Sequence, residues 1–66
     1  MTVTVNGQPR AVAEDASIAA LLAELGLAEG RVAVEVNASV IRKSNWQATV
    51  LKENDRVEVV NFVGGG

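Results

Sequence analysis

The residues best suited to chemistry are the last three, Gly64, Gly65 and Gly66, which follow an apolar, strand-like run over residues 57–63. Glycine makes up only about 7% of an average protein, so three terminal glycines in a row are rare by chance. Glycine has no side chain to bury, and it lets the backbone approach a ligand closely. We expect a thin, flexible arm that carries the Gly66 carboxylate roughly 10 Å from the domain surface. The alternative is a frayed chain end or a cloning remnant.

The carboxylate at the end of such an arm has a defined reactivity. It is a poor electrophile, because its negative charge is delocalised over both oxygens. It can, however, attack the α-phosphorus of ATP, and the acyl adenylate that forms is open to attack by a sulfur donor or an amine. The cationic side chains and the metal ion for this phosphoryl chemistry would come from an activating enzyme. The chain itself would supply only a docking surface and an unbranched arm.

The composition gives little support to a conventional active site. Cysteine and histidine do not occur, which removes thiolate chemistry, zinc–thiolate sites and the commonest general base. The serines therefore have no histidine to activate them. Two acidic pairs, Glu14/Asp15 and Glu53/Asp55, fall in predicted turns, where carboxylates are usually solvated and nothing indicates a fixed magnesium site. We expect a protein that is not an enzyme and holds no metal.

Length and charge narrow the class of protein further. The 66 residues predict one domain, near the lower size limit for a chain that folds alone. The net charge of −2 and the pI near 4.9 argue against nucleic acid as a partner, because nucleic acid requires a basic surface. The sequence has neither an apolar stretch of about 18 residues nor a signal-peptide pattern. We therefore expect a cytoplasmic protein with no membrane partner.

The N-terminal residues predict a β-hairpin. Residues 2–5 alternate polar and β-branched apolar side chains, and residues 8–13 are expected to return as the second strand. Asn6 and Gly7 between them favour a type I′ turn, which needs positive φ at both positions. Pro9 cannot donate a backbone hydrogen bond, so it is expected at the start of its strand or at a sheet edge.

One helix is predicted after the hairpin. Its apolar stripe has helical spacing and consists of Ile18, Leu21, Leu22 and Leu25. Ser17 is the expected N-cap, with Asp15 as the alternative. Gly26 lies where a left-handed residue would end the helix.

The second half of the chain predicts strands at residues 32–36, 40–41 and 56–63. Residues 42–48 between them are polar apart from Trp46, which is expected to cover a small core, with a recognition anchor as the alternative. In the last strand, valines occur on both faces, so either both faces are covered or a bulge near Val60 shifts the register. Phe62 next to the glycines is equally consistent with core packing and with a docking anchor.

One helix on one face of a mixed sheet of four to five strands is an α+β architecture. If the first and last strands pair in parallel at the centre of the sheet, the fold is a ubiquitin-like β-grasp. We expect residues 1–63 to form this domain and residues 64–66 to form the flexible C-terminal tail.

Segments spread over the whole chain match the pattern of one known family. They are Val3-x-x-Asn6-Gly7, the helix from Ser17 to Leu25, Val34-Glu35-Val36-Asn37 with Val40-Ile41, Trp46, Asp55-Arg56-Val57-Glu58-Val59-Val60 and Phe62-Val63-Gly64-Gly65-Gly66. In these residues the chain resembles the ThiS family, the sulfur carrier proteins of thiamine biosynthesis. It departs from the family pattern at Ile41-Arg42, where a proline is frequent, and at Asn54-Asp55, where Gly-Asp is usual.

The resemblance implies a β-grasp fold and a role as a protein cosubstrate. By this resemblance, an E1-like, ThiF-type adenylyltransferase would adenylate Gly66 with Mg-ATP, and a donor such as a cysteine desulfurase would supply sulfur. The product would be a C-terminal thiocarboxylate, a 1-thioglycine, which passes sulfur to a ThiG-type thiazole synthase. The residues Phe62, Val63, Gly64 and Gly65 would lead into the partner's channel.

Three alternatives share parts of this pattern. A sulfur carrier for molybdopterin, tRNA thiolation or an amino acid would have the same tail chemistry. A ubiquitin-like modifier would conjugate Gly66 to lysines, and a plain interaction domain would not use the tail at all. The adjacent Arg42 and Lys43 are consistent both with ordinary surface charge and with a contact to an acidic partner.

Overall fold

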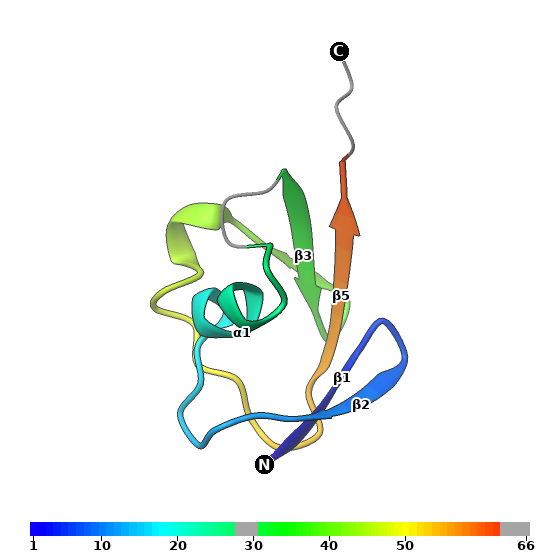
Figure 1. Cartoon of the computed structure of the whole chain (residues 1–66). Coiled ribbons are helices and arrows are strands. Elements are labelled where there is room, and N and C mark those ends of the chain that lie inside the picture. The colour runs from blue at the N-terminus through cyan, green and yellow to red at the C-terminus, as the bar shows by residue number, and fades with distance from the viewer. Residues whose placement is uncertain (28–30, 63–66) are drawn as a thin grey trace.

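A computed structural model of the chain describes residues 1–27 and 31–62. Within these residues, one mixed sheet has the strand order β2-β1-β5-β3-β4, and the helix α1 lies against one face of it (Figure 1). The elements are β1 (Thr2–Val5), β2 (Gln8–Ala11), α1 (Ile18–Glu24), β3 (Val32–Val36), β4 (Ser39–Ile41), the 3₁₀ helix η1 (Lys43–Asn45) and β5 (Arg56–Asn61). The first and last strands, β1 and β5, pair in parallel at the centre, and the other pairs are antiparallel. The predicted α+β, ubiquitin-like β-grasp fold is confirmed.

The N-terminal hairpin has the predicted turn. Asn6 and Gly7 have φ values of 51° and 82°, as a type I′ turn requires. Pro9 lies on the edge strand β2, opposite Thr4, where its missing N–H costs no ladder bond. The second strand ends at Ala11 and not at residue 13, because Ala11 pairs with the first residue of β1 and the chain then turns into the core.

The helix has both predicted ends. The Ser17 hydroxyl accepts a hydrogen bond from the backbone N–H of Ala20 at 3.0 Å, so Ser17 and not Asp15 is the N-cap. Gly26 has a φ of 75°, and its N–H donates to the carbonyl of Ala23. The N–H of Leu27 donates a second hydrogen bond, to the carbonyl of Leu22. These two hydrogen bonds together form a Schellman C-cap.

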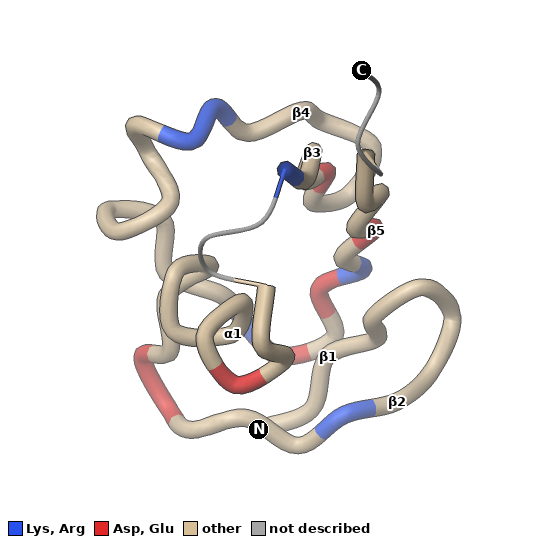
Figure 2. Tube along the Cα trace, turned by 45° about the horizontal axis from the view of Figure 1, so that its top comes forward, with Lys and Arg blue, Asp and Glu red and all other residues tan. Residues whose placement is uncertain are grey.

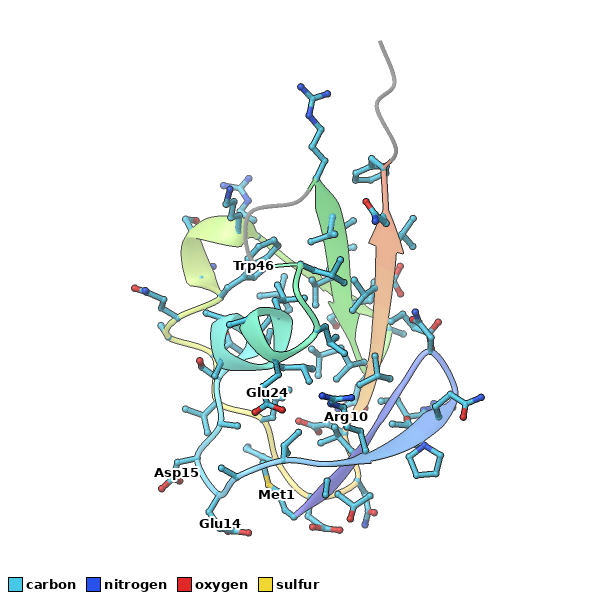
Figure 3. The ribbon with its side chains drawn as sticks, viewed as in Figure 1. Met1, Arg10, Glu14, Asp15, Glu24 and Trp46 are labelled. Atoms are coloured by element: carbon cyan, nitrogen blue, oxygen red, sulfur yellow. The ribbon has the colours of Figure 1, made fainter. Side chains whose placement is uncertain are left out.

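The core lies between α1 and the inner face of the sheet. Its fully buried members from the helix are Ile18, Leu21 and Leu22, and those from the sheet are Val3, Val34 and Val57. Trp46 covers the core at one side of α1 (Figure 3), with only 5% of its surface exposed. Its indole N–H donates to the carbonyl of Ile41 at 3.0 Å, so the buried ring keeps a hydrogen bond. The prediction that Trp46 covers a small core is confirmed.

The last strand, β5, differs from the prediction that both of its faces are covered or that a bulge near Val60 shifts its register. The pairing of β5 with β3 runs without a bulge from Val57 opposite Val36 to Asn61 opposite Val32. Val60 is nevertheless 54% exposed, so its face is neither covered nor shifted out of register. Both predicted explanations were therefore wrong. The reason is that α1 covers only the inner face, and the outer face of β5 meets water.

Candidate functional site

The central strand β5 leads directly into the residues that the sequence marks as reactive. Phe62 follows the last residue of β5, and its backbone N–H donates to the carbonyl of Arg31 at 2.6 Å. Its side chain is 55% exposed, which rules out full burial in the core and leaves the ring open to a partner. The other predicted site residues, Val63 and the glycines 64–66, lie outside the described residues.

The side chain of Asn6, which directly follows β1, forms hydrogen bonds to β5 along the edge of β5 that faces away from β3. Its side-chain oxygen accepts a hydrogen bond from the N–H of Val59 at 2.7 Å, and its Nδ2 donates to the carbonyl of the same residue at 3.1 Å. The first strand has already ended at Val5, so this side-chain amide stands in for a further peptide unit of the ladder. The sequence assigned Asn6 only to the turn, because its contact with Val59 depends on the tertiary pairing of β1 and β5.

A second asparagine secures the start of β5. The side-chain oxygen of Asn37 accepts from the N–H of Arg56 at 3.0 Å, and its Nδ2 donates to Asp55 Oδ1 at 3.0 Å. Asp55 Oδ2 also accepts from the N–H of Lys52 at 2.8 Å. Both oxygens of the Asp55 carboxylate thus accept hydrogen bonds that hold the turn before β5, which favours a structural role over a catalytic one.

Glu53 and Glu14, from the same predicted turns, have ordinary partners as well. Glu53 Oε1 accepts from the N–H of Thr2 at 3.0 Å, and Glu14 lies 3.4 Å from the N-terminal ammonium group. Arg10 and Glu24 form a further exposed ion pair between β2 and α1 (Figure 3). Among residues 1–27 and 31–62, no three His, Cys, Asp or Glu side chains gather as a metal site would require. In the same residues, no helix is long and apolar enough to span a membrane.

The outer face of the sheet carries exposed side chains of β4 and β5 and the half-buried Glu35 of β3. Glu35 in β3 lies directly opposite Glu58 in β5 on one side and opposite Val40 in β4 on the other. The acidic segments of β3 and β5 accordingly lie side by side in Figure 2. Next to them, Ala38 and Arg56 complete the lining of an open depression of about 270 Å³.

The fold and this exposed C-terminal strand define a ubiquitin-like β-grasp protein. The ThiS family model matches residues 3–66, which is nearly the whole chain. The chain belongs to the ThiS family.

Solved structures and curated proteins agree with this assignment. The crystal structure of the thiamine biosynthesis protein ThiS from Geobacter metallireducens superposes with a TM-score of 0.83 at 40% identity, and it covers all of both chains. Proteins named thiazole synthase from Magnetococcus marinus and Paramagnetospirillum magneticum are 41% and 36% identical over all 66 residues. The chain spans only 20% of the length of each of these two proteins. An uncharacterised protein of Porphyra purpurea, ycf40, is 30% identical, and the chain covers 93% of it.

Proposed function

We propose that this protein is a sulfur carrier for thiamine biosynthesis, whose Gly66 carboxylate becomes a thiocarboxylate that donates sulfur to the thiazole ring. The observation that carries the proposal is the ThiS family match, which runs to Gly66 and so includes the glycine tail. The likeness to a thiamine biosynthesis protein at 40% identity over both whole chains supports the same pathway.

The chemistry begins with activation of the terminal carboxylate. One carboxylate oxygen of Gly66 attacks the α-phosphorus of ATP, and pyrophosphate leaves. The terminal sulfur of the donor's persulfide then attacks the glycyl carbonyl, and AMP leaves with the electron pair of the broken C–O bond. A thiol reductant cleaves the S–S bond of the resulting acyl disulfide, which releases the thiocarboxylate. Mg-ATP belongs to the activating enzyme, a ThiF-type adenylyltransferase, and the sulfur derives from a donor such as a cysteine desulfurase. This chain is a cosubstrate in these steps, and because they use ATP we place it in the cytoplasm.

In this proposal, residues 1–63 form the docking domain and residues 64–66 form the reactive arm. Phe62, Val63, Gly64 and Gly65 enter the partner's channel, and a side chain on the arm would obstruct it. The acceptor of the sulfur is a ThiG-type thiazole synthase. Two proteins named thiazole synthase each contain a segment similar to all of this chain, which supports a shared task for the two parts.

Intact mass spectrometry tests the proposal. The protein is incubated with a ThiF-type adenylyltransferase, Mg-ATP and a sulfur donor, and a variant without Gly65 and Gly66 serves as the control. We expect a mass gain equal to the replacement of one oxygen by sulfur, localised to Gly66, and no gain in the control.

An unchanged mass, with the adenylyltransferase active on another carrier, would contradict the proposal. Recovery of Gly66 joined to lysine side chains of other proteins would instead indicate a ubiquitin-like modifier. Thiocarboxylate that forms but delivers no sulfur to thiazole synthase would indicate a carrier for another pathway.

A further inference from the structure

The turn between β1 and β2 joins an asparagine to a glycine, an order that is chemically labile. Asn6 is the only asparagine of the chain that a glycine follows. The backbone nitrogen of Gly7 is unhindered, because glycine has no side chain and the space where its Cβ would lie is open. Such a nitrogen can attack the side-chain amide carbon of the preceding asparagine once the two groups meet. The turn is therefore a candidate site for deamidation.

The contact of Asn6 with β5 keeps these two groups apart. Its Oδ1 accepts from the N–H of Val59 at 2.7 Å, and its Nδ2 donates to the Val59 carbonyl at 3.1 Å. Asn6 also has a left-handed φ of 51°, and with the usual left-handed ψ of about +47° its Cβ and the nitrogen of Gly7 lie on opposite sides of the Cα–C bond. For the reaction, the Asn6 amide must turn back towards Gly7 and give up both bonds to Val59. Local opening must therefore come first.

We propose that Asn6 is a deamidation site that the fold protects through its contact with Val59, and that deamidation, once it has occurred, permanently loosens this contact. The proposal goes beyond the carrier function and does not depend on it. In the reaction, the nitrogen of Gly7 bonds to Cγ of Asn6, the Cγ–Nδ2 bond breaks, and ammonia leaves with the proton of the Gly7 N–H. Water then opens the succinimide ring at either carbonyl, which leaves aspartate or isoaspartate at position 6.

Both products remove the donor that faces the Val59 carbonyl. The aspartate product places a carboxylate oxygen there, so that two acceptors face each other. The isoaspartate product also adds a methylene group to the backbone of a two-residue turn, which no longer fits the type I′ geometry. The pairing of β1 with β5 ends at Val5 opposite Val57, so the Asn6 side chain continues the connection to β5 beyond this point. Its loss releases this edge of the strand that leads to Phe62.

The backbone amide of Val59 reports directly on this contact. Along a strand, the N–H and C=O of one residue point to the same side, and those of Val59 point to Asn6, away from β3. Hydrogen exchange at a protected amide requires local opening of the structure. Exchange at Val59 and deamidation at Asn6 should therefore depend on the same opening.

The test compares deamidation at Asn6 and Asn37 in the folded protein and in concentrated urea, at mildly alkaline pH, by peptide mapping. Asn37 is the internal reference, because it has the same φ of 51° and a bonded side chain but precedes Ala38. In urea, Asn6 should react faster than Asn37. Folding should slow the reaction at Asn6 by about tenfold or more, since two hydrogen bonds must break first.

Two further measurements connect the reaction to the contact with Val59. Below the unfolding transition, small additions of urea should raise the deamidation rate of Asn6 in proportion to the exchange rate of Val59. The isoaspartate form, separated by chromatography, should exchange the Val59 amide about tenfold faster than wild type. Gly7→Asn is the matched control: asparagine tolerates the left-handed conformation, but its side chain hinders the attacking nitrogen. This variant should keep the wild-type exchange at Val59 and leave Asn6 largely intact even in urea.

Three results would overturn the inference. If Asn6 reacts no faster than Asn37 in urea, the turn is not a labile site. Equal rates at Asn6 in the folded and the unfolded protein would show that the contact with Val59 gives no protection. If the purified deamidated protein keeps the wild-type exchange rate at Val59, the reaction does not loosen β5.

Discussion

The two faces of the same three strands, β5, β3 and β4, differ sharply in what they carry. The inner face presents Val34 and Val57, which are fully buried under α1. The outer face presents Glu35 opposite Glu58 and the exposed valines Val40 and Val60. Because successive side chains of a strand point to opposite faces, the same strands can serve both folding and partner binding. The inner side chains hold the domain together, and the outer ones are free to meet a partner at little cost in folding free energy.

The largest expected effect lies on the helix that covers the inner face. Leu22→Ala removes a fully buried side chain and should lower the free energy of unfolding by about 3 kcal/mol, because it leaves a cavity in a small core. Val40→Ala on the outer face removes a side chain that is mostly in water and should cost less than about 0.5 kcal/mol. Chemical denaturation of both variants measures the difference. Equal losses would show that the two faces do not divide the tasks in this way.

The next effect concerns the bond between the hairpin and β5. Asn6→Asp keeps the shape and the acceptor for the N–H of Val59 but replaces the donor with a carboxylate oxygen that faces the Val59 carbonyl. Loss of this donor in a partly buried contact should cost about 2 kcal/mol.

Asn54→Asp provides the control for this prediction. Asn54 shares the left-handed backbone of Asn6, with φ values of 70° and 51°, and its side chain is exposed. Thermal unfolding at neutral pH should therefore show a much smaller loss of stability for Asn54→Asp. If the two variants lose equal stability, the Asn6 amide contributes nothing beyond its turn conformation.

Adjacent residues of β5 allow the sharpest comparison of the two faces. Val59→Thr buries a hydroxyl group on the inner face and should cost about 1–2 kcal/mol, whereas Val60→Thr on the outer face should change stability by less than about 0.5 kcal/mol. Denaturant titration of the two variants gives this difference directly. A similar cost at both positions would mean that something covers the outer face of the free protein.

Local signals in the sequence predicted most of the elements. The Asn6-Gly7 turn, the Ser17 cap and the Gly26 stop each depend on the conformational preference of one or two residues, and all three are confirmed. The exposure of Val60 was not predicted, because the pattern of one strand does not say how many helices cover the sheet. The attachment of Asn6 to Val59 was missed for a related reason, since it joins residues 53 positions apart in the chain. Of the predicted site, only Phe62 falls within the described residues.

The smallest predicted effect is a gain in stability in the turn between β3 and β4. Ala38 has a φ of 72°, a left-handed conformation that costs an alanine about 1–2 kcal/mol. Ala38→Gly relieves this strain, and after the entropy that glycine adds to the unfolded chain the net gain should be about 0.5 kcal/mol. Ala33→Gly within β3, where the backbone is extended, should destabilise the protein instead.

Thermal unfolding of the two glycine variants checks the sign of each change. A loss of stability for Ala38→Gly would show that the turn between β3 and β4 is not strained. If Ala38→Gly is stabilising and leaves the KM of adenylation unchanged, the strain at this turn is unrelated to docking. Ala38 lines the depression beside Glu35 and Glu58, so an altered KM would assign a part in docking to this turn.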